Sequence, residues 1–388
     1  MTALLTRIHA DPTDIDLSEF TTLCQQSTKL VDYPNATDVE QNVLIYDHSA
    51  FVELSAVSRQ SLLAELHRAL SSGPGVLVIR TAYADTKVVD AHTRVFERIM
   101  AQEAESRTAG DHFAAAGANT RIWNALQKAA KQNPESFIEY YANPVMHAVS
   151  EAWLGPHYQL TSQVNVVHPG GQAQQPHRDF PLGFQTNEIA SQFPLAVHRM
   201  SSLLTLQGAV AHTDMPVETG PTEFLPFSHH YELGYLAWRD EGFKDFFAQH
   251  AVQLALQKGD QVFFNPALFH AAGTNRTPDQ HRMANLLQVS SAFGVPMETL
   301  DHDAMSQVVF PTLLARYQAG SLCDTAFHGV IATVAQGYSF PTNLDTDPPV
   351  GGLAPQTGQQ LLTQAIQEGW SAGALDAALS ARCDRRRA

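Results

Sequence analysis

The strongest constraint on the fold is a change in the character of the sequence at Tyr158. Before this residue the regular patterns are helical, whereas after it short apolar runs alternate with turns rich in Pro, Gly, Asn and Asp. Helices followed by a block of strands favour a mainly β fold with flanking helices, whose core is a double-stranded β-helix, or jelly roll, over alternating βαβ units. The predicted strands are Tyr158 to Val167, Leu203 to Ala211, Gln261 to Phe264 and Met283 to Ser291.

Helical periodicity is clearest in the first half of the chain. Apolar residues recur at spacings of three and four from Leu54 to Leu70, which predicts an amphipathic helix ended by Gly73-Pro74-Gly75. The continuous apolar run from Val76 to Ile79 then predicts a strand that is covered on both faces. Further helices are expected around residues 88–104 and 135–154.

These patterns divide the chain into three parts. Residues 1–50 have weak periodicity and are expected to form an N-terminal extension packed on the core. Residues 51–300 are expected to form the jelly-roll domain with its helical support. Residues 301–388 are expected to pack on the core as a helical and loop region. Its predicted helix, Gln359 to Ala378, would be able to reach across the barrel mouth.

Composition limits the partners. The formal net charge of -15 argues against a surface for nucleic acid or an anionic membrane, because both require clustered Lys and Arg. No apolar stretch approaches the roughly 20 residues that span a bilayer. The cysteines Cys24, Cys323 and Cys383 form no CxxC pair, which favours reduced thiols and a cytoplasmic protein over a disulfide framework. We expect a small-molecule partner, and no pattern indicates an oligomeric state.

The segment GGQAQQPHRDF places His177 and Asp179 two residues apart. On an extended strand both side chains leave the same face and can share one metal ion. His270 lies just beyond the strand Gln261 to Phe264 and supplies a second imidazole. Two imidazoles and one carboxylate on one face of an octahedral metal, with open positions, are typical of non-haem Fe(II) oxygenases. The sequence therefore predicts a site for Fe(II) that admits 2-oxoglutarate and O2.

A second H-x-D pair, His212 and Asp214, is an alternative. Placing the metal there would leave His177 and Asp179 without a role, so we favour the first pair. We interpret His212 as a strand-end residue near the pocket, and Asp214 as a residue that hydrogen-bonds within its own turn.

Binding of 2-oxoglutarate also requires a cation for its far carboxylate. Arginine suits this role because its planar fork makes two charge-assisted hydrogen bonds to one carboxylate. Arg282 opens the last predicted strand, and a turn after His270 could return it beside the strand that ends there. Arg276 is nearer in sequence but lies inside that turn, where we expect a solvated side chain.

In this order the motifs resemble those of the phytanoyl-CoA dioxygenase family of Fe(II)/2-oxoglutarate-dependent oxygenases. The glutamine-rich lead into His177 and Asp179 resembles the family's proximal metal motif. DMPVETG (214–220) and EFLPFSH (223–229) resemble its acidic turn and its Ser-His segment. GDQVFFNPALFHAAGTN, followed by Arg282, resembles the distal histidine and the 2-oxoglutarate arginine.

The resemblance extends from about Gly75 to Phe293 and implies further roles. In the family, the strand before the proximal motif supplies polar groups to the co-substrate, which implies cofactor-binding roles for Gln163 and Asn165. Halogenating members replace the metal-binding carboxylate by a small residue, whereas Asp179 is present, so hydroxylation or a related oxidation is implied. The family often has a hydroxyl residue two positions after the distal histidine, and Ala272 stands there instead. One co-substrate contact is therefore expected elsewhere.

The expected function is a dioxygenase that oxidises an unactivated C–H bond of a small specialised metabolite and releases succinate and CO2. No catalytic residue beyond the metal ligands is expected, because this chemistry needs neither a general base nor a nucleophile. An acyl-CoA is not the expected substrate, because no basic patch is present to hold its phosphates. Two alternatives stay open: a non-redox jelly-roll metal- or ligand-binding protein, and a Zn or Mn isomerase or hydrolase with the same three ligands.

Overall fold

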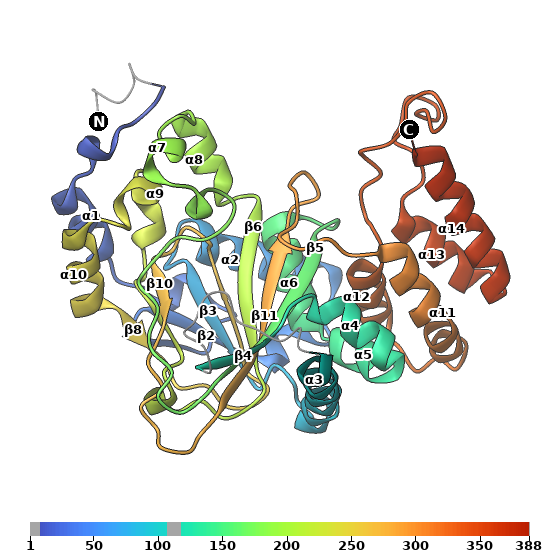
Figure 1. Ribbon diagram of the computed structural model, residues 1–388, viewed down its shortest axis with the longest axis horizontal. Coiled ribbons are helices and arrows are strands. Elements are labelled where there is room, and N and C mark those ends of the chain that lie inside the picture. The colour runs from blue at the N-terminus through green and yellow to red at the C-terminus, as the bar shows by residue number, and fades with distance from the viewer. Residues whose placement is uncertain (1–7, 107–117, 388) are drawn as a thin grey trace.

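The computed structural model describes residues 8–106 and 118–387 and contains two β-sheets (Figure 1). The large sheet has the strand order β1-β2-β3-β9-β6-β11-β5-β4, and the small sheet has the order β10-β7-β8. Neighbouring strands are antiparallel except for β2 and β3. The large sheet comprises β1 (Asp38–Glu40), β2 (Val43–Asp47), β3 (Val76–Arg80), β4 (Asn119–Ile122), β5 (Gln159–Val167), β6 (Thr205–Ala211), β9 (Gln261–Phe264) and β11 (Arg282–Ser290). The small sheet comprises β7 (Thr222–Phe224), β8 (Val252–Gln253) and β10 (His270–Ala272).

The two faces of the large sheet have different neighbours, as β11 illustrates. Its residues Met283, Leu287 and Val289 belong to the main hydrophobic core, while the alternate residues Leu286 and Gln288 line a cavity of about 460 Å³. Side chains alternate between the faces of a strand, so one face packs on helices and the other faces the cavity. Residues of the small sheet line the same cavity, which therefore lies between the two sheets.

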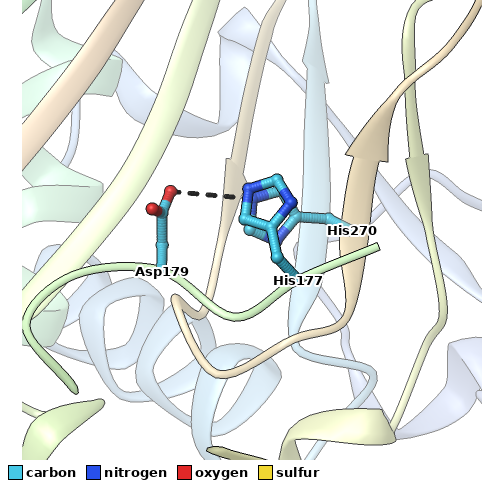
Figure 2. A group of neighbouring side chains, drawn as sticks. All are labelled: His177, Asp179 and His270. Atoms are coloured by element: carbon cyan, nitrogen blue, oxygen red, sulfur yellow. Dashed lines mark ion pairs between the residues drawn. The ribbon is translucent and has the colours of Figure 1, made fainter. Parts of the chain in front are cut away.

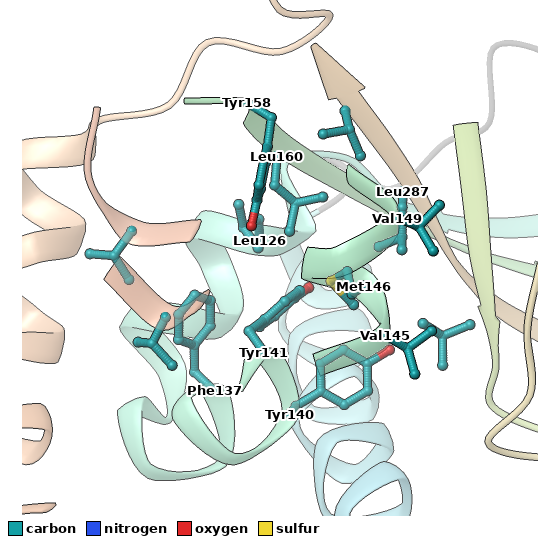
Figure 3. Packing of buried hydrophobic residues seen from close by; sticks show 14 of the residues in the cluster. Leu126, Phe137, Tyr140, Tyr141, Val145, Met146, Val149, Tyr158, Leu160 and Leu287 are labelled. Atoms are coloured by element: carbon teal, nitrogen blue, oxygen red, sulfur yellow. The ribbon is translucent and has the colours of Figure 1, made fainter. Parts of the chain in front are cut away.

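Helices surround this double sheet (Figure 1). The main core lies between the outer face of the large sheet and helices that include α5 and α6, and Tyr140, Met146, Leu160 and Leu287 belong to this one cluster (Figure 3). The helices are α1 (Leu17–Cys24), α2 (Ala56–Ser71), α3 (Thr86–Ser106), α4 (Ala125–Gln132), α5 (Pro134–Tyr141), α6 (Pro144–Leu154), α7 (Asn187–Ala190), α8 (Leu195–Ser201), α9 (Gly234–Ala237), α10 (Glu241–His250), α11 (His302–Gln318), α12 (Asp324–Val334), α13 (Gly358–Gln367) and α14 (Ala372–Arg386).

The double-stranded β-helix core with a helical buttress is confirmed, and the four predicted strands correspond to β5, β6, β9 and β11. Two predicted helices are each divided in two. The helix expected at 135–154 breaks at Pro144, which has no N–H to donate, and Asn143 caps the second piece. The helix expected at Gln359 to Ala378 breaks at Gly369, which has a φ of 67°.

The two ends of the chain pack in different ways. Within the first fifty residues, the buried strand β2 pairs with β3, so this segment is part of the large sheet.

At the other end, α11 and α12 pack against α4, α5 and α6. Figure 1 shows α13 and α14 beyond them, at the far right of the molecule. The expectation that the C-terminal helix reaches across the barrel mouth is wrong, because its apolar face packs on α11 instead. No helix in residues 8–106 and 118–387 is long and apolar enough to cross a membrane.

Candidate metal centre

Three predicted metal ligands meet at the cavity wall (Figure 2). One possible ligand atom from each of His177, Asp179 and His270 lies within 4.8 Å of the others. The backbone brings the two segments together, because the N–H of His177 donates to the carbonyl of His270 at 3.0 Å and the reverse bond measures 3.3 Å. His270 begins β10, and Asp179 is anchored by its N–H to the carbonyl of Pro266 at 3.0 Å.

Backbone carbonyls determine which imidazole nitrogen is available. His177 Nδ1 lies 2.8 Å from the carbonyl of Gln175, and His270 Nδ1 lies 2.9 Å from that of Leu268. A carbonyl oxygen only accepts, so each Nδ1 carries the proton and each Nε2 keeps its lone pair. His270 Nε2 lies 3.7 Å from Asp179 Oδ2. A backbone carbonyl that holds Nδ1 is the usual arrangement for histidines that bind a metal through Nε2.

The charge states suit a divalent cation. Burial, followed by the neighbouring His270, lowers the pKa of His177, which favours the neutral imidazole that a metal requires. Burial opposes ionisation of Asp179, but the closeness of the His270 and His177 side chains outweighs burial and holds the carboxyl pKa below its usual value. The group therefore offers one carboxylate and two imidazole nitrogens.

Gln207 on β6 is a neighbour of the carboxylate that the sequence analysis missed. Its Nε2 donates to Asp179 Oδ2, and Gln288 Oε1 on β11 accepts from the same nitrogen at 3.4 Å. The two glutamines are cross-strand partners. Their position on the cavity face follows from strand alternation, but the sequence contains no sign of which polar strand residue meets a ligand.

Arg282 lies at the start of β11 and lines the same cavity. It is 6% exposed, and its Nη1 donates to the carbonyl of Thr219, in the acidic turn, at 3.2 Å. Burial lowers its pKa to about 10. Among the residues that the structure describes, no carboxylate forms an ion pair with it. A buried, uncompensated guanidinium is costly by itself and is suited to an anionic ligand.

The two nominated strand residues also face the cavity. Asn165 is 9% exposed, and its Oδ1 has no hydrogen-bond partner in the described part of the chain. Gln163 Oε1 accepts from Arg121 Nη1 at 3.4 Å, so it is already engaged with protein. Arg121 pairs with Asn165 across β4 and β5 and lines the cavity too.

The rival pair is separate from this centre. His212 is 3% exposed, its Nδ1 lies 2.8 Å from Thr93 Oγ1, and its Nε2 lies 2.8 Å from Tyr140 OH. Both ring nitrogens are therefore used, and burial lowers the pKa of His212 to about 3. Asp214 accepts a hydrogen bond from the N–H of Lys258 at 2.9 Å rather than from within its own turn. His212 packs on the helical side of the large sheet and does not line the cavity.

Comparison with known proteins is consistent with these features. The family profile described as Phytanoyl-CoA dioxygenase (PhyH) matches residues 72–284, more than half of the chain. Dioxygenase trt7 of Aspergillus terreus is 32% identical over 144 residues, which cover 36% of this chain and 45% of trt7. Dioxygenase olcK of Penicillium canescens is 24% identical over 293 residues, which cover 73% of this chain and 88% of olcK.

This chain spans about half the length of several curated relatives that it matches, with 45%, 54% and 46% of their lengths aligned. Among solved structures, the "non-heme alpha ketoglutarate dependent carbocyclase SnoK from nogalamycin biosynthesis" is similar, with a TM-score of 0.44 and 21% identity. That match covers 66% of this chain and 91% of SnoK.

Proposed function

This chain belongs to the phytanoyl-CoA dioxygenase family, and from that premise we propose that it is an Fe(II)- and 2-oxoglutarate-dependent dioxygenase of the hydroxylase type. The observation that carries the proposal is the pairing of two features in one cavity. His177, Asp179 and His270 converge within reach of one metal ion, and Arg282 brings a buried cation without a carboxylate partner among the described residues.

Each part of the cavity has a place in this reaction. His177, Asp179 and His270 would hold the iron, which would supply the oxidising chemistry with 2-oxoglutarate and O2. Arg282 would bind the far carboxylate of 2-oxoglutarate through two charge-assisted hydrogen bonds. Asn165 lines the cavity, and its amide N–H would donate a further hydrogen bond to 2-oxoglutarate in place of the one that Ala272 lacks. The chain's contribution is binding and orientation, so no general base is needed.

The cavity lining favours a compact and largely apolar substrate. Its volume of about 460 Å³ lies within the range for small-molecule sites, and Phe264 and Leu286 are typical of its apolar walls. Its charged lining residues, among those the structure describes, are Asp179, Arg121 and Arg282. With Arg282 assigned to 2-oxoglutarate, little positive charge remains for the phosphates of an acyl-CoA. We therefore propose a small specialised metabolite as the substrate, oxidised at a C–H bond.

The first prediction tests the reaction class. Protein freed of metal and then loaded with Fe(II) should convert 2-oxoglutarate to succinate under air, slowly alone and faster with a substrate from a panel of small apolar metabolites. Asp179→Ala should lose this turnover because one of three metal ligands is gone, whereas Asp279→Ala, which changes a carboxylate at the exposed tip of the β10–β11 turn, should keep it. Succinate would be measured by mass spectrometry. Metal binding without succinate, across the whole panel, would instead favour a Zn or Mn isomerase, a hydrolase or a binding protein.

A further inference from the structure

Arg178 lies between His177 and Asp179 in the sequence but contacts a different part of the molecule. It is 2% exposed and does not line the cavity. Its Nη2 donates to the carbonyls of Ser228 at 2.8 Å and Tyr231 at 2.7 Å. Because neighbouring side chains of an extended segment leave opposite faces, the guanidinium is buried behind the metal centre.

Aromatic rings complete the surroundings of this cation. Arg178 Cζ lies 5.0 Å from the ring centroid of Tyr235 and 5.4 Å from that of Phe269. No carboxylate in residues 8–106 and 118–387 forms an ion pair with it, and burial lowers its pKa to about 10. A Cβ on Gly234 would overlap the guanidinium, so the space for Arg178 depends on that glycine. A buried charge is expensive, and groups of this kind are retained where they fix a geometry.

The contacts of Arg178 lead directly to the third ligand. Phe269 immediately precedes His270, and its N–H donates to Ser228 Oγ at 2.8 Å. Ser228 therefore joins both segments, because its carbonyl accepts from Arg178 and its hydroxyl accepts from Phe269. The Ser-His segment 223–229 is thus tied to this chain at a second point, because its Phe224 already pairs with His270 between β7 and β10.

We propose that Arg178, Ser228 and Phe269 form a clamp behind the metal centre that sets the distance between the His177–Asp179 segment and His270. Arg178 and Ser228 are then positioning residues for the metal. The inference rests on the proposed function in one respect, that the triad binds a metal. Ligand spacing must hold within about 0.5 Å for tight binding, and the clamp adds to the two backbone hydrogen bonds that already join His177 and His270.

The test is Co(II) binding by the full-length, metal-free protein, followed through the visible absorption of the bound ion. Arg178→Met keeps the apolar stem but removes the guanidinium, and Ser228→Ala removes only the hydroxyl that accepts from Phe269. We expect Co(II) affinity to fall about 10-fold in both variants, with an altered absorption spectrum, which is the lower end of the effect of losing a group hydrogen-bonded directly to a metal ligand. Arg178→Lys retains a donor for the two carbonyls and should recover part of the affinity.

Arg382→Met provides a matched control. Arg382 is also buried, at 4% exposure, and its Nη2 donates to Gln336 Oε1 at 3.1 Å, but it lies on α14, away from the cavity. Its loss should lower the temperature of unfolding and leave Co(II) affinity unchanged. This separates a positioning effect from a general loss of stability.

The outcomes distinguish the clamp from the metal site itself. Absence of Co(II) binding by the wild-type protein would contradict the proposed function. Tight wild-type binding that is unchanged in Arg178→Met and Ser228→Ala would show that the clamp does not position the ligands. If Arg178→Met does not fold, the Co(II) affinity of Ser228→Ala relative to the wild type alone tests the clamp.

Discussion

At the scale of single residues, the site depends on which polar atoms the protein leaves unused. The Nδ1 atoms of His177 and His270 are held by backbone carbonyls, which leaves both Nε2 atoms for a metal. Arg282 illustrates the same principle for charge, since its Nη1 donates to the carbonyl of Thr219, a neutral group, and burial penalises its cation. Burial of such groups is favourable only when a bound ligand supplies the missing hydrogen-bond or charge partner.

The prediction at this scale concerns Arg282. Arg282→Ala should raise the KM for 2-oxoglutarate by about 100-fold, because charge-assisted hydrogen bonds contribute about 1.5–3 kcal/mol. Arg276→Ala is the control, since Arg276 is exposed in the turn between β10 and β11. The 2-oxoglutarate dependence of succinate formation would be measured for both. An equal KM for 2-oxoglutarate in the two variants would show that Arg282 does not bind the co-substrate.

At the scale of elements, the acidic turn 214–220 supports the arginine. Thr219 supplies the carbonyl that holds Arg282, and Gly220 follows with a φ of 72°. A Cβ on Gly220 would lie 2.5 Å from the backbone of Gly273, in the segment just after β10. The turn thus packs directly on the chain that carries His270, and a glycine is required both by its conformation and by this close approach.

Gly220→Ala tests the role of the turn. Both Gly220 and Gly320 have positive φ, at 72° and 63°, but Gly320 has nothing within 4 Å of an added Cβ. Gly320→Ala should therefore lose about 1–2 kcal/mol of unfolding free energy from backbone strain alone. Gly220→Ala should lose more and should also raise the KM for 2-oxoglutarate. Urea unfolding and succinate kinetics would check this, and matching values for the two variants would contradict it.

At the scale of the whole molecule, a buried polar group joins the sheet to the helices. His212 follows β6 and meets Thr93 of α3 and Tyr140 of α5 through hydrogen bonds of 2.8 Å. Its ring packs against Phe96 and Tyr140, which belong to the main core. The core tolerates the imidazole only in its neutral form, which is why burial lowers its pKa to about 3.

This arrangement predicts a pH dependence of stability. The pKa of a histidine is about 6.5 in an unfolded chain, so between pH 6.5 and 3 the unfolded state binds a proton that folded His212 does not. Stability should therefore fall as the pH falls through this window and be unaffected by His212 above it. At pH 5 the loss is about 2 kcal/mol. Urea unfolding at pH 7 and pH 5 should show a smaller difference for His212→Gln than for the wild type, and an equal difference would refute the assignment.

Local sequence patterns predicted several of the strands and the side chains that could bind a metal. Strand alternation and turn residues predicted β5, β6, β9 and β11, because the period of side chains along a strand is a local property. The H-x-D spacing and the later histidine indicated an iron site for the same reason. The strand β2 was missed, although its apolar run VLIY is of the same kind as the run that predicted β3.

Only the tertiary structure decided which of these groups meet. Two H-x-D pairs are equivalent by spacing, and the fold places His177 and Asp179 beside His270 while it buries His212 among aromatic rings. Contacts between distant segments, such as Gln207 with Asp179 or Arg178 with Ser228, have no local signature. The reason is physical: sequence spacing fixes the face from which a side chain leaves its backbone, whereas packing of whole elements fixes what it finds there.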